Sequence, residues 1–149
     1  MRLPAALLAV AVVAAGCGGA DAPSRAEYAT AADKICADVN RQVAKLSAGA
    51  SGGALDRALT SLGKQLDDAV ERLRDLDRPS GRDGDLAKRW IDQLSRDRDR
   101  FKQILAELRS ALRARDPGRI RSASRRLDRV NFSDTDRLAR GLGMKACAQ

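Results

Sequence analysis

Apolar side chains recur alternately every four and every three residues through 55–76, and this spacing restricts the fold more than any other feature of the sequence. The repeat consists of Leu55, Leu59, Leu62, Leu66, Ala69, Leu73 and Leu76. On an α-helix these positions form one stripe, and a seven-residue repeat favours neighbours that pack nearly parallel or antiparallel to it. One helix cannot bury such a stripe alone, so the repeat predicts a helical bundle.

Comparable stripes and helix-boundary signals predict further helices. Ser24 and Glu27 form a capping box, in which the two side chains satisfy free amides at a helix start. Asp116 followed by Pro117 marks another start, and Ser133 is expected to cap the last helix. We therefore expect an all-α fold, an antiparallel bundle of about four helices plus a short C-terminal helix, over 24–47, 55–76, 83–115 with Asp83 or Asp85 as its cap, 117–130 and 134–142.

Residues 1–17 differ from the rest of the chain. Residues 3–15 carry no charge, and three small residues precede Cys17. Such a run is shorter than the roughly 20 apolar residues that a membrane-spanning helix needs, and it is typical of an export signal. The segment Ala14-Ala15-Gly16-Cys17 resembles the lipobox of bacterial lipoproteins, in which the thiol is acylated and the preceding peptide bond is cut. An ordinary secretory leader with a chance cysteine is the alternative.

The resemblance implies three segments and a location. Residues 1–16 are expected to be a signal peptide, 17–23 a flexible tether of mostly small residues, and 24–149 the helical domain. Acyl chains on Cys17 would anchor the protein to the extracytoplasmic face of the cell membrane, since each buried methylene contributes about 0.8 kcal/mol.

Two cysteines remain once Cys17 is assigned to lipid. Cys36 lies beside the apolar stripe of the first expected helix, and Cys147 lies near the C-terminus. Two remaining thiols in an exported chain indicate a disulfide, and joining Cys36 to Cys147 would add at most about 4–5 kcal/mol in the chain-entropy treatment. A metal site or a redox centre is the weaker interpretation, because the sequence has no histidine and no CxxC motif.

Both ends of the domain resemble small helical lipoproteins of high-GC Gram-positive bacteria. Besides the lipobox, the resemblance rests on the segments Tyr28-Ala-Thr-Ala-Ala-Asp33-Lys-Ile35-Cys36 and Gly141-Leu-Gly-Met-Lys-Ala-Cys147. The middle of the chain is not covered. The resemblance implies an anchored, disulfide-closed helical domain, and it implies no activity.

The residue types argue against an enzyme. Without histidine, the chain has neither a Ser-His-Asp nor a Cys-His arrangement. Clustered carboxylates such as Asp67 with Asp68, or Asp75 with Asp77, lie among arginines, where ion pairing explains them better than catalysis. The glycines of 49–53 lack the lysine and the preceding strand of a phosphate-binding loop. We expect no catalytic residue, no cofactor and no metal.

Positive charge is concentrated in one part of the chain. The formal net charge is +8, and residues 96–129 hold 12 basic and 5 acidic residues. The expected basic face consists of Arg119, Arg121, Arg125, Arg126 and Arg129. Such a face favours an anionic lipid, an anionic wall polymer or an acidic protein as partner. Nucleic acid is not expected, because the chain is exported and its aromatic residues are not interleaved with basic ones.

Two hypotheses about function follow. The first is a lipid-anchored, non-enzymatic binding or scaffolding module that uses the arginine face. The second is a small-ligand carrier with a cavity between helices lined by Trp90 and Phe101, although both lie on an apolar stripe where core packing is favoured. The charged run 95–100 interrupts that stripe, and we interpret it as a solvated face rather than a functional polar site.

Overall fold

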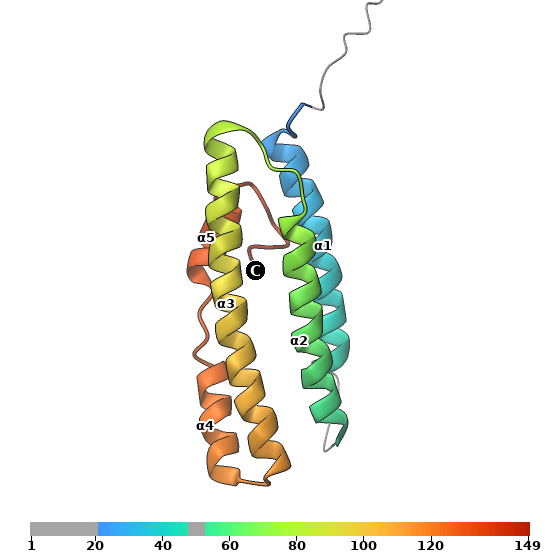
Figure 1. The fold of residues 1–149 in the computed structure, drawn as a ribbon, viewed down its shortest axis with the longest axis vertical. Coiled ribbons are helices and arrows are strands. Elements are labelled where there is room, and N and C mark those ends of the chain that lie inside the picture. The colour runs from blue at the N-terminus through green and yellow to red at the C-terminus, as the bar shows by residue number, and fades with distance from the viewer. Residues whose placement is uncertain (1–20, 48–52) are drawn as a thin grey trace, which may run out of the picture.

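Five helices make up the protein in a computed structural model that describes residues 21–47 and 53–149. They are α1 (Arg25–Ser47), α2 (Gly53–Arg74), α3 (Gly81–Arg113), α4 (Pro117–Leu127) and α5 (Ser133–Gly141), and the described ranges contain no β-strand (Figure 1). The expected all-α fold, with a short helix near the C-terminal end, is confirmed. Cys17, the predicted signal peptide and the loop 48–52 lie outside the described residues.

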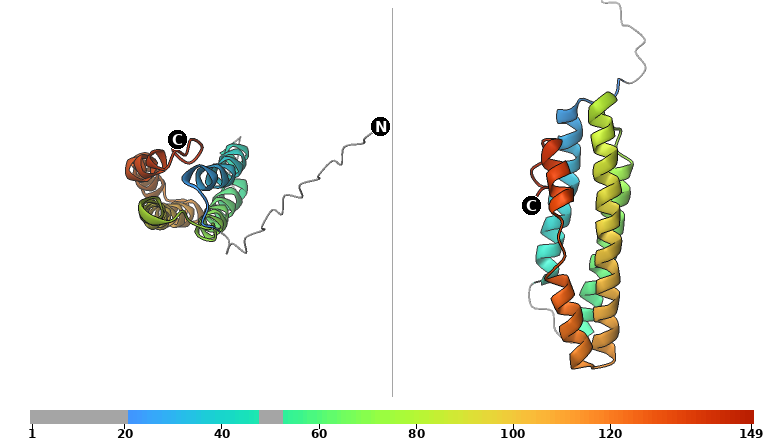
Figure 2. Two further views of the ribbon diagram at one scale, coloured as in Figure 1. Left: turned by 90° about the horizontal axis from the view of Figure 1, so that it is seen from above. Right: turned by 90° about the vertical axis from the view of Figure 1, so that its left-hand side faces the viewer.

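The long helix α3 is the central element of the bundle. α1 and α2 run antiparallel to each other, and α3 packs against α2 (Figure 1). α4 and α5 follow one another along α3 and run opposite to it, as Figure 2 shows from two further sides. Two short helices therefore share the place that a fourth long helix would occupy, with α4 beside the C-terminal part of α3 and α5 beside its N-terminal part.

Side-chain capping explains two of the helix starts. The backbone amide and the hydroxyl of Ser24 donate to Glu27 Oε2 at 2.8 and 2.7 Å, and these bonds hold the pKa of Glu27 below its usual value. Asp116 Oδ1 accepts from the amides of the second and third residues after it, both at 3.0 Å, with Pro117 in the first turn of α4. Both predicted starts are confirmed.

Two other predicted caps are wrong. α3 begins before Asp83 and Asp85, and its N-cap residue is Ser80, which forms no side-chain cap bond. Acidic residues are favourable in the first turn of a helix whether or not they cap it, which explains the misleading signal at Asp83. Ser133 is the first residue of α5 rather than its cap, because its amide donates to Asn131 Oδ1 at 2.8 Å.

The main core cluster lies where α1, α2, α3 and the end of α5 converge. Its largest fully buried side chains are those of Trp90, Tyr28 and Leu142. The rings of Tyr28 and Trp90 meet edge to face, with centroids 6.5 Å apart. Alanines of the same cluster with no exposed surface, Ala32 and Ala87 among them, let the helices approach closely. Trp90 therefore packs in the core, as favoured from its position on the apolar stripe.

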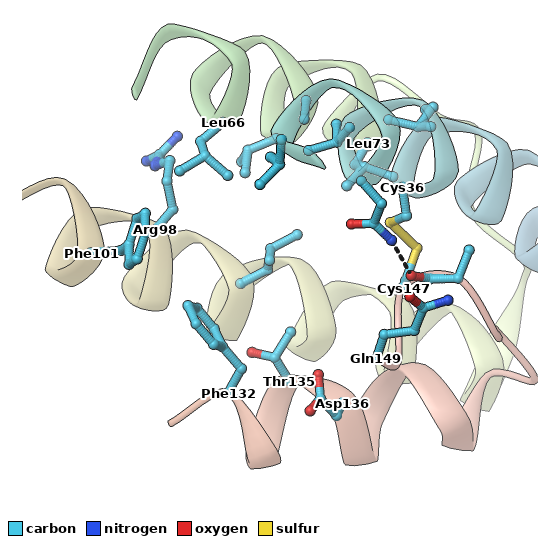
Figure 3. A pocket seen from close by; sticks show the side chains of 18 of the residues that line it. Cys36, Leu66, Leu73, Arg98, Phe101, Phe132, Thr135, Asp136, Cys147 and Gln149 are labelled. Carbon is cyan, nitrogen blue, oxygen red and sulfur yellow. Dashed lines mark hydrogen bonds between the residues drawn. A yellow bond between two sulfur atoms is a disulfide. The ribbon is translucent and has the colours of Figure 1, made fainter. Parts of the chain in front are cut away.

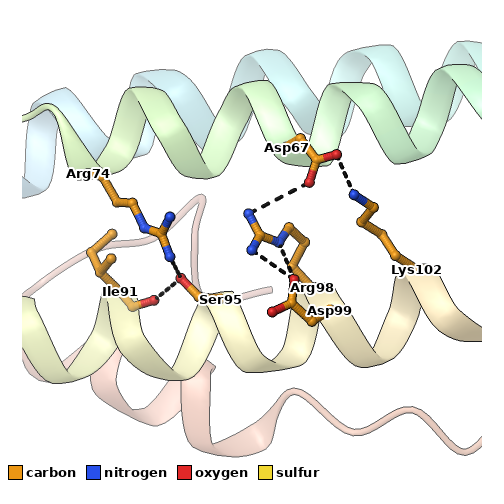
Figure 4. A network of polar contacts seen from close by, with 7 residues as sticks. All are labelled: Asp67, Arg74, Ile91, Ser95, Arg98, Asp99 and Lys102. Atoms are coloured by element: carbon orange, nitrogen blue, oxygen red, sulfur yellow. Dashed lines mark hydrogen bonds and ion pairs between the residues drawn. The ribbon is translucent and has the colours of Figure 1, made fainter.

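The charged run 95–100 is not a solvated face throughout. Ser95 and Asp97 are 8% and 4% exposed. Ser95 Oγ accepts from Arg74 of α2 at 2.8 Å, and Asp97 Oδ2 accepts from Thr135 Oγ1 of α5 at 2.6 Å (Figure 4 shows the contact with α2). The solvated interpretation is wrong at these two residues, because α2 covers one side of α3 here and α5 covers another.

Ion pairs continue the contact between α2 and α3. Asp67 of α2 pairs with Arg98 at 3.6 Å and with Lys102 at 2.5 Å (Figure 4). Near the start of α2, Asp56 accepts a hydrogen bond from Arg109 of α3 at 2.9 Å, and this bond holds the pKa of Asp56 below its usual value. Partly exposed pairs of this kind fix the register of two helices more than they stabilise them.

Gly84→Ala is expected to destabilise the fold. A Cβ added at Gly84 would clash with the carbonyl oxygen of Pro79, so the turn before α3 would have to shift. Overpacking of this kind typically costs about 1–3 kcal/mol. Gly63→Ala is the matched control, because nothing lies within 4 Å of its added Cβ and alanine favours a helix by about 0.5–1 kcal/mol over glycine. Urea denaturation should move the two variants in opposite directions, and equal stability would contradict this packing.

Candidate ligand-binding groove

A cavity of about 280 Å³ lies between α1, α2, α3 and α5 and is partly open to solvent (Figure 3). We call it the central groove. Its walls are mostly apolar, and each long helix contributes to them: Val39 from α1, Leu62 and Leu66 from α2, and Leu94 and Phe101 from α3. Its size is close to the lower end of small-molecule sites, which enclose about 300–1,000 Å³.

The division of the fourth position between α4 and α5 explains why the groove is open. α4 packs along α3, and Figure 1 shows it on the side of α3 away from α2. Between α4 and α5 the chain places Phe132, whose ring lies 6.2 Å from that of Phe101. The apolar stripe of α2 continues past the core, so Leu62 and Leu66 remain half-buried. Part of the stripe expected to form a packed seam therefore lines a groove.

The segment after α5 forms one wall of the groove and is fastened to α1. Cys147 is joined to Cys36 with their Cα atoms 5.2 Å apart, which confirms the predicted disulfide. Asp33, one turn before Cys36, accepts hydrogen bonds from the backbone amides of Lys145, Ala146 and Cys147 at 2.8–3.1 Å. A covalent bond and a group of charge-assisted hydrogen bonds thus hold this wall.

Arg98 and Asp136 are the two lining residues with charged side chains. The side chain of Arg98 is 15% exposed, and its guanidinium lies 2.7 Å from a carboxylate oxygen of Asp99. It also lies 3.6 Å from a carboxylate oxygen of Asp67 on α2. Figure 3 shows Arg98 directed toward α2 beside Leu66. The charge of Arg98 is therefore balanced by carboxylates of the protein.

Asp136 has no such balance. Its carboxylate forms no hydrogen bond or salt bridge with any residue in the described ranges, and Figure 3 shows it beside Thr135 on the α5 side of the groove. Desolvation raises the pKa of Asp136, while nearby Arg140 opposes this effect and buried Asp97 adds to it. A carboxylate in this position can contact a molecule that occupies the groove.

The sequence reasoning missed Asp136 and misplaced Asp97. Asp97 Oδ1 accepts from Gln93 Nε2 at 3.1 Å, and its other oxygen accepts from Thr135, so both of these donors are neutral. The interruption of the apolar stripe of α3 at Asp97 was the one signal for this polar group. Asp136 carries no signal of its own, since it lies in an ordinary polar stretch of the chain.

The two aromatic residues named for a ligand cavity are separated in the structure. Phe101 lines the groove, whereas Trp90 is not among the lining residues and is fully buried against Tyr28. The expectation that both line one cavity is wrong for Trp90. Its side chain packs against Tyr28 of α1, one helical turn before the first groove-lining residue of α3, Leu94.

The predicted arginine face lies on α4 and the turn after it, but its members point to two sides. At about 100° per residue, Arg119 and Arg126 lie on one flank of the buried stripe of α4. There Arg126 pairs with a glutamate of α3, and Arg119 donates to a serine of α3 at 3.5 Å. Arg121 and Arg125 lie on the other flank. These two and Arg129 are exposed and form no salt bridge with a carboxylate in the described ranges.

Other kinds of site find no support in the part of the chain that the structure describes. Across 21–47 and 53–149, no three side chains of the types His, Cys, Asp and Glu are placed to hold a metal ion. None of the helices described is both long enough and apolar enough to cross a membrane. No protein-family model, curated protein or solved structure matches this chain.

Proposed function

We propose that the protein is a lipid-anchored, non-enzymatic binding protein that holds a small apolar or amphiphilic molecule in the central groove. The observation that carries the proposal is a partly open, mostly apolar cavity of about 280 Å³ with walls from four helices. The apolar walls of this partly open groove are in contact with water, and an apolar ligand would remove that apolar surface from water. The disulfide and the hydrogen bonds to Asp33 hold one wall in place, so little ordering cost is left for binding.

The anchor in this proposal rests on the sequence. Cys17 has the lipobox pattern before it, and it is the one cysteine of three outside the disulfide. The intact mass of protein purified from membranes should exceed that of a chain beginning at Cys17 by the mass of its acyl chains. Protein that still begins at Met1 would contradict the anchor.

A filled groove should bind a hydrophobic dye more weakly. We expect the neutral dye N-phenyl-1-naphthylamine to bind the full chain saturably when Cys17→Ser prevents acylation and the disulfide is oxidised. Val39→Phe places a larger side chain against the groove and should weaken dye binding about tenfold or more, a loss of about 1.4 kcal/mol. Fluorescence titration measures both affinities.

Val130→Phe is the matched control for this test. Val130 is half-buried like Val39, but it lies after α4 and does not line the groove. Its substitution should leave dye affinity nearly unchanged. Equal affinity of the Val39→Phe variant and the parent chain would overturn the groove as the binding site.

A second candidate function is contact with a polyanion through Arg121, Arg125 and Arg129. The observation in its favour is that these three exposed guanidinium groups have no carboxylate partner in the described ranges. Figure 1 places α4 at the end of the bundle opposite to the start of α1. The three arginines would therefore meet a partner at the end away from the tether.

Substitution of Arg121, Arg125 and Arg129 by Gln should weaken binding to anionic phospholipid vesicles or to soluble polyphosphate at low salt. The expected loss is about 1 kcal/mol for each neutralised arginine near an anionic surface. Cosedimentation with vesicles and a polyphosphate competition measure it. The control neutralises three exposed basic residues elsewhere, Lys34, Arg82 and Lys145. An equal loss in both variants would show that only net charge matters, and the patch would be rejected.

A further inference from the structure

We infer that the central groove selects cationic amphiphiles, which are molecules with an apolar tail and one amine or quaternary ammonium group. The inference rests on the proposed binding function of the groove and adds the charge of its ligand. The tail would contact the apolar side chains of α1 and α2, and the cation would lie against the carboxylate of Asp136.

The positive charge at the groove is already engaged. Arg98 lies 2.7 Å from Asp99 Oδ1 and 3.6 Å from Asp67 Oδ1, so its guanidinium has a carboxylate on α3 and another on α2. Figure 4 shows the three groups together on the face of α3 that meets α2. An anionic ligand at Arg98 would have to compete with both carboxylates for the same donors.

The negative charge at the groove is not engaged. No described residue donates a hydrogen bond to the carboxylate of Asp136 or forms a salt bridge with it. Asp97 is buried nearby and accepts its hydrogen bonds from Thr135 and Gln93, which are neutral, and it forms no salt bridge with a described residue. Two carboxylates thus act in the same direction on a ligand: they attract a cation and repel an anion.

Arg140 is the nearby cation, and it does not remove this preference. It acts on Asp136 through the Coulomb interaction but forms no salt bridge with it. The side chain of Arg140 is exposed, so water and salt screen its charge. A cation held in the groove would be closer to Asp136 and less hydrated, so its attraction to the carboxylate would be stronger.

The position of Asp136 also defines how a ligand would lie. Figure 3 shows Asp136 and Thr135 on the α5 side of the groove, across from Leu66 and Leu73 on α2. The walls between these two sides are mostly apolar, with Val39 of α1 and Leu94 of α3 among them, and the charge of Arg98 is balanced by Asp67 and Asp99. A linear molecule with its charge at one end matches this arrangement, whereas a molecule charged at both ends would bury a second charge among leucines.

Three probes of equal chain length test the inference: octylamine, octanol and octanoate, each displacing N-phenyl-1-naphthylamine from the full chain with Cys17→Ser. At neutral pH and low salt, octylamine should displace the dye at a concentration about tenfold lower than octanoate, which corresponds to about 1.4 kcal/mol. Asp136→Asn should bring the two within about twofold while leaving octanol unchanged. Asparagine has nearly the same shape as aspartate, and the substitution removes a charge whose burial is unfavourable, so the fold should be preserved. Circular dichroism of the variant checks this.

Asp134→Asn is the matched control, since it makes the same change on α5 at an exposed residue paired with Arg137. It should keep the full preference for octylamine.

Octanoate binding as tightly as octylamine to the parent chain would overturn the inference, and this comparison needs no variant. An undiminished preference in the Asp136→Asn variant would also overturn it. If neither octanol nor octylamine displaces the dye, the proposed binding function of the groove is wrong. If octanol displaces the dye but octylamine is not preferred over octanoate, only the charge preference is wrong.

Discussion

Close packing around Trp90 is the constraint on which the rest of the structure depends. Aromatic residues make up 3% of the chain, so very few large side chains are present to fill the space between helices. The side chains of Trp90 and Tyr28 are fully buried in the core, and the buried alanines around them let the helices approach closely. Next to these residues, leucines and valines of the helical stripes line a cavity of about 280 Å³. The central groove lies beside this core and shares Ile35, Ala69 and Leu73 with it.

Periodicity and capping signals were enough to predict the helices, since both are local properties. The stripe at 55–76, the capping box at Ser24 and the proline after Asp116 each correspond to an observed feature. The disulfide was also predictable, from cysteine count and expected compartment. Burial at Asp97 was not, because it depends on Thr135, which lies 38 residues away. The groove was equally hidden, because it arises from the way α4 and α5 divide the length of α3.

The polar side chains of α3 are sorted according to the helix they face. Toward α2, Arg98 and Lys102 meet Asp67, so positive and negative charges are balanced. Toward α5, Asp97 meets only neutral donors among its described contacts, and Asp136 follows without a partner. On the α2 side of the groove the charged side chains are therefore paired, whereas on the α5 side the carboxylate of Asp136 is not. The two ends of a ligand in this mostly apolar groove would therefore meet different surroundings. A cationic end would be favoured near Asp136, because an unpaired charge is costly to bury elsewhere among apolar side chains.

The fastening of residues 145–147 to Asp33 and Cys36 has a consequence for the order in which the protein acquires its structure. The disulfide joins residues separated by 111 positions, and the bonds to Asp33 span a similar distance along the chain. Contacts between sequence neighbours, as in the hairpins α1–α2 and α3–α4, carry a much smaller loop-closure cost. These hairpins should therefore assemble first and the ring close last. A partly folded chain would already be largely helical but would lack one wall of the central groove, so the ligand proposed for this groove would be bound only after folding is complete.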